Sequence, residues 1–374
     1  MGLNLVDIPC KSSIENWVQK CGHYIYEHPD VSKYKEGYGL IIDECMVIGQ
    51  ERMFAILGVK TNKEGSQAIN LSETEILSLQ VKPSWSGEQI TESLQKVGEK
   101  MGKKADYIIC DGGSNLGKGI KGYEGLRVCD CGHEIARQTE NVYKNDERYK
   151  SFSTAIAQTK FKEVMKDTSY LTPPRQRAIA RFMNLSDTID WAKKMLKNFN
   201  FLNKDEQKAF ACIKEHIDLV EELDGVFDAS NKILKVLKNN GLSFKTIEQC
   251  KSISKVFTQT AKGLSAKWIS KIEKYLEQEK VKLPNEKTIW NASSDIIESL
   301  FGNFKSHKAD NGLNGVTPFA LVLPVLTKVN PEKPKINIDF KVALEETFMT
   351  DLKQWNQEHL IENQIIRRRK ILKI

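Results

Sequence analysis

The chain has 374 residues, 40% of them hydrophobic and 28% charged, which is ordinary for a globular protein with more than one structural unit. Its formal net charge of +7 favours an acidic partner, most commonly nucleic acid, although a generally basic soluble protein would share it. No apolar run approaches the roughly 20 residues that span a bilayer. The first ten residues lack the basic and apolar regions of a signal peptide. We therefore expect a cytoplasmic protein that does not enter membranes.

The eight cysteines are scattered and include no Cys-x-x-Cys pair, so we expect reduced thiols and no disulfide framework. Cys129, Asp130, Cys131 and His133 stand close together in the sequence and raise the question of a zinc site. Cysteines at alternate positions bind one tetrahedral ion poorly, and no second ligand pair follows at zinc-finger spacing. Zinc is therefore disfavoured.

Residues 9–28 have a helical pattern of apolar residues that starts at Ile14 and Trp17, and Ser12 and Ser13 could cap such a helix. The segment resembles the start of a recognition helix in a helix-turn-helix, but only a dozen residues precede it. A helix that packs at the edge of a domain is at least as good an interpretation. We expect residues 1–35 to form a helical segment, the remnant of a DNA-binding domain or a packing helix.

Two apolar runs, 38–43 and 53–59, are typical of central strands and predict an antiparallel pair joined by a turn over residues 45–52. The first run ends on Asp43, which places a carboxylate at the edge of the sheet, where it needs a cation or water. Asp43 and Glu44 point to opposite faces, because side chains alternate along a strand. Only one of them can join a site on a given face, and we favour Asp43.

The alternating segment 74–81 predicts a third, half-buried strand, and an amphipathic helix follows over 86–101. A fourth strand again ends on an aspartate, Asp111, after which glycines form a turn. Further on we expect a fifth strand at 126–130 and a helix over 132–146. Right-handed crossovers then predict a mixed α/β sheet in the order 3-2-1-4-5. Asp43 and Asp111 would end neighbouring parallel strands, which predicts a metal site.

Residues 149–288 show no strand-like alternation and form a predicted all-helical block. In it, Arg175, Arg177 and Arg181 follow a Thr-Pro-Pro helix start and could contact phosphates or form a solvated basic face. Trp191 and Trp268 have apolar neighbours at helical spacing and are expected in the core. The helices are expected at 152–166, 173–182, 187–199, 205–223, 229–239, 244–257 and 262–279.

The segment 289–330 contains a helix that Ser293 or Ser294 could cap, with Asp295 in its first turn. Glu298 and Lys305 stand seven residues apart on one side of it, and Lys305 could reach a phosphate or be a surface lysine. A glutamate amid the apolar residues of this helix would need a counter-charge. The expected apolar face is Ile297, Leu300, Phe301 and Phe304. For residues 331–374 we expect a helical region and a basic tail with Arg367, Arg368 and Arg369, either solvated or a nucleic-acid arm.

An aspartate after the first strand, another after the fourth and a glutamate on a later helix resemble the DDE transposases of bacterial insertion sequences. The segment 294–305 is similar to the Glu-helix of those enzymes, and Asp130-Cys131-Gly132-His133 resembles a Cys/Asp-x-x-His pattern found after their second aspartate. The resemblance covers roughly residues 36–310. It implies a ribonuclease-H-like core, at 36–148 and 289–330, interrupted by a helical insertion domain at 149–288.

The resemblance further implies that Asp43 bridges two Mg²⁺ ions, for which Mn²⁺ substitutes, and that Asp111 and Glu298 each hold one of them. His133, oriented by Asp130, would lie near the scissile phosphate, or it would simply be a histidine bonded to Asp130 at a helix start. The partners implied are transposon-end and target DNA, bound by a homodimer on paired ends in the bacterial nucleoid.

Two other functions stay open. A structure-specific nuclease could have the same fold, although the long helical block is more than a simple nuclease needs. A transposase-derived DNA-binding protein without activity is the other alternative, because the segment before the core is shorter than the DNA-end-binding domain usual in the family. The presence of all three acidic residues argues against loss of the catalytic site.

Overall fold

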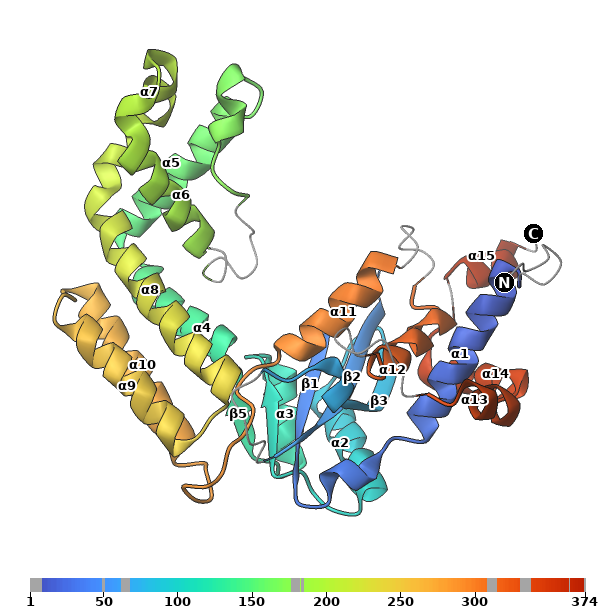
Figure 1. Cartoon of the computed structure of the whole chain (residues 1–374). Coiled ribbons are helices and arrows are strands. Elements are labelled where there is room, and N and C mark those ends of the chain that lie inside the picture. Colours follow the sequence, from blue (N-terminus) through green and yellow to red (C-terminus); the bar gives the residue numbers. More distant parts are fainter. Residues whose placement is uncertain are drawn as a thin grey trace, which may run out of the picture. The chain divides into compact units, whose positions relative to one another are not determined.

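The computed structural model describes residues 9–48, 51–61, 68–175, 182, 185–307, 315–329, 338–362 and 364–372, with the backbone alone for 45–48 and 307 (Figure 1). The chain divides into two compact units. The sheet unit consists of Met1–Cys129 and Ile289–Ile374, and the helical unit consists of Asp130–Thr288. The helical unit therefore begins with the helix expected at 132–146, earlier than the predicted boundary at residue 149.

One five-stranded mixed sheet forms the sheet unit, and its order β3-β2-β1-β4-β5 confirms the predicted order. The three antiparallel strands are β1 (Tyr38–Ile48), β2 (Glu51–Lys60) and β3 (Glu75–Lys82). On the other side of β1, β4 (Tyr107–Cys110) and then β5 (Arg127–Cys129) pair in parallel. These parallel strands are short, with four residues in β4 and three in β5.

The first hairpin differs from the prediction. The turn expected over residues 45–52 is wrong, because β1 continues to Ile48 and β2 already begins at Glu51. Met46, Val47 and Ile48 favour strand conformation, so pairing continues past the acidic residues. The register shifts between Asp43 and Met46, which is the signature of a β-bulge. Asp43 therefore lies at a bulge inside β1 and not at the end of the strand.

The two faces of the sheet have different coverings. Even-numbered residues such as Ile42 and Cys110 join a buried cluster with apolar residues of α2 (Gly87–Met101) and α3 (Ser114–Gly122). On the opposite face the Tyr107 ring stacks on Trp290, with centroids 4.7 Å apart. A few residues after Trp290 the chain forms α11 (Asp295–His307), which lies against β1 (Figure 1).

The first helix, α1 (Lys11–Glu27), confirms the predicted helical segment, but its N-cap is Cys10 and no side chain caps it. The cap expected from Ser12 or Ser13 is wrong, since both serines lie inside the first turn. Ile14 is 46% exposed, whereas the later residues Cys21, Gly22, Ile25 and Tyr26 are buried. The helix contacts α12 (Val322–Leu326), α13 (Phe340–Glu346) and α14 (Met349–His359). It is thus a packing helix of the sheet unit.

The helical unit (Figure 1) comprises α4 (Cys131–Tyr143), α5 (Glu147–Glu163), α6 (Leu185–Asn198), α7 (Lys204–Phe210), α8 (Ile217–Asn240), α9 (Phe244–Thr258) and α10 (Leu264–Lys280). The fully buried Trp268 joins α10 to α4, because its indole N–H donates to Thr139 Oγ1 at 3.0 Å. Trp191 packs edge-on against Phe210 and donates to the Leu171 carbonyl. The core position predicted for Trp268 is confirmed, whereas Trp191 is only half-buried.

Two predicted helices of this unit have different bounds. The expected break near residue 225 is wrong: α8 continues through Gly225, whose α-carbon faces the Phe257 ring, and one glycine costs a helix only about 1 kcal/mol. The segment before α8 is instead divided into α7 and the 3₁₀ helix Ala211–His216. The helix expected at 173–182 is not helical at 173–175, and most of its remainder lies outside the described residues. Other 3₁₀ helices are Val31–Tyr34, Leu71–Glu73, Asp167–Leu171, Phe199–Phe201 and Pro318–Leu321.

Candidate active site

Asp43 lies on β1, Asp111 directly follows the neighbouring parallel strand β4, and both are on the same face of the sheet. Gly39 and Ile41 of β1 pair with Tyr107 and Ile109 of β4, so two further residues along each strand bring Asp43 level with Asp111. Side chains alternate along a strand, so both aspartates share the face on which Tyr107 stacks with Trp290. Asp43 is only 8% exposed and Asp111 is half-buried.

The backbone around Asp111 is fixed by two hydrogen bonds. Asp111 Oδ1 accepts from the Gly113 amide at 2.8 Å, which is the geometry of an Asx turn. The Asp111 carbonyl oxygen accepts from Arg127 Nη2 at 2.6 Å. A β-carbon at Gly113 would lie 2.9 Å from Asp111 Oδ1, so a glycine suits this sharp exit from β4. The role predicted for the glycines after Asp111, as turn formers, agrees with this geometry.

Glu298 belongs to the first turn of α11. The helix begins as predicted, with the Asp295 amide donating to Ser293 Oγ at 3.2 Å. Its buried residues include the predicted apolar face of Ile297, Leu300, Phe301 and Phe304. Glu298 and Lys305 are both exposed, so the expectation that Glu298 sits amid apolar neighbours is wrong. The reason is its angular position, one residue beyond Ile297 and off the buried stripe.

Glu44, which follows Asp43 on β1, is an acidic residue that the sequence did not predict at the metal site. Its Oε1 is 3.8 Å from Arg52 Nη1, whereas its Oε2 is buried without a hydrogen-bond partner among the described side chains. Burial raises the pKa of Glu44, the negative charge of Asp111 raises it further, and Arg52 opposes both effects. The effect of the Asp111 charge makes Glu44 a further carboxylate to test beside the predicted pair. Glu44 lies within the register shift between Asp43 and Met46, which no local sequence pattern predicts.

Asp130 and His133 lie at the start of the helical unit. Asp130, 2% exposed, is the N-cap of α4, and its Oδ1 accepts from the backbone amide of His133 at 2.8 Å. This bond explains the Asp-x-x-His spacing as helix capping. His133 belongs to the helical unit, whereas the three predicted acidic ligands belong to the sheet unit, so a place for His133 beside a scissile phosphate stays a prediction.

Those basic residues predicted to contact DNA that the structure describes are all exposed. Arg175 is exposed and not helical, and Arg177 and Arg181 lie outside the described residues. The tail expected to be basic forms a helix, α15 (Gln364–Leu372), in which no residue is buried. Its exposed arginines are Arg367, Arg368 and Arg369.

The carboxylates are a donor set that suits Mg²⁺ or Mn²⁺, which prefer oxygen ligands. In the described part of the chain, no three His, Cys, Asp or Glu residues are already grouped as metal ligands. Like charges repel one another at short range, so a divalent cation is what would draw these carboxylates together. The same described residues contain no helix that is long and apolar enough to cross a membrane.

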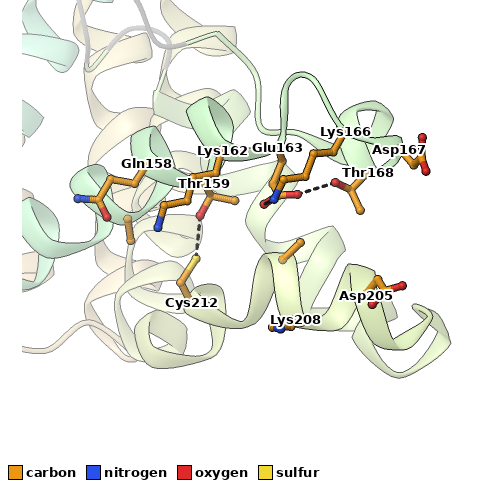
Figure 2. Close-up of a pocket in the computed structure, with 12 residues that line it drawn as sticks. Gln158, Thr159, Lys162, Glu163, Lys166, Asp167, Thr168, Asp205, Lys208 and Cys212 are labelled. Atoms are coloured by element: carbon orange, nitrogen blue, oxygen red, sulfur yellow. Dashed lines mark hydrogen bonds and ion pairs between the residues drawn. The ribbon is translucent and has the colours of Figure 1, made fainter.

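A pocket of about 780 Å³ lies in the helical unit (Figure 2). Its acidic wall is already bonded, because Glu163 accepts from Thr168 Oγ1 at 2.7 Å and from Lys166 at 2.9 Å. Thr159 Oγ1 contacts Cys212 Sγ at 3.3 Å across the pocket. None of the predicted site residues lines this pocket, so we do not assign the chemistry to it.

Comparison with protein-family models finds no match for this chain, and no curated protein sequence matches it either. Its function must therefore be inferred from the residues themselves. The pairing register of β1 with β4, continued by two residues, brings Asp43 and Asp111 to a common face of the sheet.

Proposed function

We propose that this chain is a DDE-type DNA transposase that cleaves DNA strands at transposon ends and joins them to target DNA with two divalent metal ions. The observation that carries the proposal is the position of Asp43 on β1 and Asp111 directly after β4, on one face of the sheet, with the Glu298 helix α11 against β1. The sheet order 3-2-1-4-5 is compatible with a ribonuclease-H-like core.

Asp43, Asp111 and Glu298 would hold the ions, and Glu44 is a further carboxylate within reach of Asp111. Bound ions of this kind activate a hydroxyl nucleophile and stabilise the charge on the leaving oxygen of a phosphodiester. The protein contributes rigid ligands on strands and one ligand on a helix. The Arg127 bond to the Asp111 carbonyl restrains the second ligand, since a guanidinium bond to a half-buried carbonyl is strong.

The test is metal-dependent cleavage of DNA that carries the gene's own flanking sequences. We expect the wild type to cut at a defined position in a terminal repeat with Mg²⁺ or Mn²⁺, and Asp43→Asn, Asp111→Asn and Glu298→Gln to lose cleavage by about 100-fold or more. Glu88→Gln is the matched control, because Glu88 is an exposed acid in the first turn of α2, on the other side of the sheet. Equal cleavage by wild type and Glu298→Gln would show that Glu298 is not a ligand of the site. DNA binding without metal and without any cleavage would favour a DNA-binding protein that has no catalytic activity.

A further inference from the structure

Helix α10 has a row of lysines on its outward side. Lys267, Lys271 and Lys274 follow one another at intervals of four and three residues, so they share one side of the helix. Lys267 and Lys274 are exposed and Lys271 is half-exposed. The other side of α10 is the core side, with the fully buried residues Trp268, Ile272 and Leu276. We call Lys267, Lys271 and Lys274 the lysine stripe.

The lysine stripe has no internal counter-charge. No side chain that the structure describes forms an ion pair or hydrogen bond with any of its three ammonium groups. The acid one turn beyond Lys274 is Glu277, which pairs with Lys251 of α9. At the end of the same helix, Lys280 pairs with Glu248 at 2.7 Å. The stripe therefore differs from Glu277 and Lys280, whose charges pair within the fold.

The stripe does not help α10 to form. Lysines four and three residues apart repel one another on a helix surface. Lys267 also stands near the helix start, where the macrodipole disfavours positive charge, and the first turn has no acidic residue to offset it. Charge interactions within the helix thus give no reason for these three lysines, whereas a bound polyanion would relieve their repulsion.

We propose that the lysine stripe binds the phosphate backbone of DNA. Seven residues of helix place the three charges along about 10 Å, and duplex DNA carries one negative charge per roughly 1.7 Å of its axis. Ser270 and Gln278 are exposed on the same side and can donate neutral hydrogen bonds to phosphate oxygens. An anionic membrane fits less well, because an interfacial helix needs a free apolar side and that side of α10 is buried.

The inference rests on the proposed function in one respect, that DNA is the polyanion, but it needs no catalysis. Binding of the full chain to a labelled duplex of arbitrary sequence is measured with EDTA at several salt concentrations. The triple variant Lys267→Gln, Lys271→Gln, Lys274→Gln should bind more weakly. The slope of log K against log salt should become shallower by about 2 to 3, since each phosphate that a lysine neutralises adds roughly 0.9 to it.

A matched control removes three lysines that are already paired within the helical unit. Lys193, Lys194 and Lys232 contact Asp224, Asp190 and Asp228 at 2.5, 2.5 and 2.6 Å. Changing them to glutamine alters the net charge equally and should leave the slope nearly unchanged. Replacing the stripe by three arginines should preserve both affinity and slope, which also shows that the fold accepts substitutions there.

The inference would be overturned if the wild type bound no DNA even at low salt, or if the salt slope were unchanged in the stripe variant. It would also be overturned if the stripe and control variants lost DNA affinity equally. The last result would mean that only overall charge matters. Cleavage is assayed separately with metal. Loss of cleavage activity in Asp43→Asn with unchanged binding in EDTA would separate the catalytic proposal from this one.

Discussion

The buried carboxylate of Glu51 accepts a hydrogen bond from the backbone amide of Val316 at 2.7 Å. Both residues are 4% exposed. Glu51 begins β2, the partner strand of β1, and Val316 follows the segment after α11. This bond therefore ties the chain that leaves the Glu298 helix to the hairpin that carries Asp43.

Gly315, next to this bond, has little tolerance for a side chain. Its φ is +60°, and an added β-carbon would lie 2.2 Å from Glu51 Oε1. We expect Gly315→Ala to destabilise the protein by at least about 2 kcal/mol, from backbone strain plus displacement of Glu51. Gly102→Ala is the control, because its φ is +68° and nothing lies within 4 Å of an added β-carbon. It should cost only the strain, about 1 kcal/mol. Denaturant unfolding of both variants measures the difference, and equal losses would mean that the Glu51 contact is unimportant.

The pH dependence of Glu51 provides a second prediction. Burial raises the pKa of Glu51 above its usual 4.5, and the Val316 amide only partly opposes this. A carboxyl whose pKa is raised in the folded state contributes stability that is present at low pH and lost as pH rises through the folded-state pKa. Glu51→Gln keeps an oxygen for the Val316 amide and removes the charge. Its melting temperature should match the wild type near pH 4 and exceed it at pH 7 to 8. A wild type that is the more stable at pH 8 would contradict this account.

Glu75 is 1% exposed and lies between two lysines, with Oε1 2.5 Å from both Lys33 Nζ and Lys328 Nζ. Removing the buried charge with Glu75→Gln takes the bonded carboxylate from two partly buried ammonium groups and leaves them only the more distant charge of Asp30. We expect a loss of about 2 to 3 kcal/mol, below the largest losses for fully buried pairs because both lysines keep some contact with water. Glu124→Gln breaks the exposed pair with Lys104, at 3.1 Å, and should cost less than about 1 kcal/mol. Urea unfolding compares the two.

His359 should make the sheet unit less stable at low pH. Its ring stacks on Trp355, with centroids 4.9 Å apart, and Nδ1 donates to the Leu79 carbonyl at 2.8 Å. Burial lowers the pKa of His359 below 6.5, an effect that the Leu79 bond and the charges of Glu358 and Glu27 oppose.

A histidine with a lowered pKa contributes stability that is fully present above pH 6.5 and lost as pH falls below that value. Hydrogen exchange in α14 should therefore quicken between pH 7 and pH 5, relative to exchange in β1. His359→Gln should remove most of this pH dependence, and a variant that kept it in full would point to another group.

The sequence was a good guide to the sheet and to the buried helix faces. The apolar runs of β1, β2 and β4 leave few other pairings once right-handed crossovers are required. The buried residues of α11 follow from helical spacing alone, because Ile297, Leu300 and Phe304 recur at three and four residues.

Three features depended on tertiary contacts and could not be predicted. The bulge after Asp43 is set by pairing with β2, which the local pattern of β1 does not encode. The passage of α8 through Gly225 relies on the neighbouring Phe257 ring. Glu44 lies within this register shift, where strict alternation along the strand no longer fixes the face of a side chain.

Glu44 is therefore the most informative residue to change at the site. Its charge repels that of Asp111, so without metal Glu44→Gln should be at least as stable as the wild type. If divalent ions bind among these carboxylates, excess Mn²⁺ raises the melting temperature of the wild type, because a ligand that binds the folded state stabilises it. That increase should be smaller in Glu44→Gln, whereas Glu88→Gln should show the full increase. The opposite result would be a Glu44→Gln variant that is less stable than the wild type without metal and is stabilised by Mn²⁺ as much as the wild type. Glu44 would then be a structural partner of Arg52, and ion binding would be left to Asp43, Asp111 and Glu298.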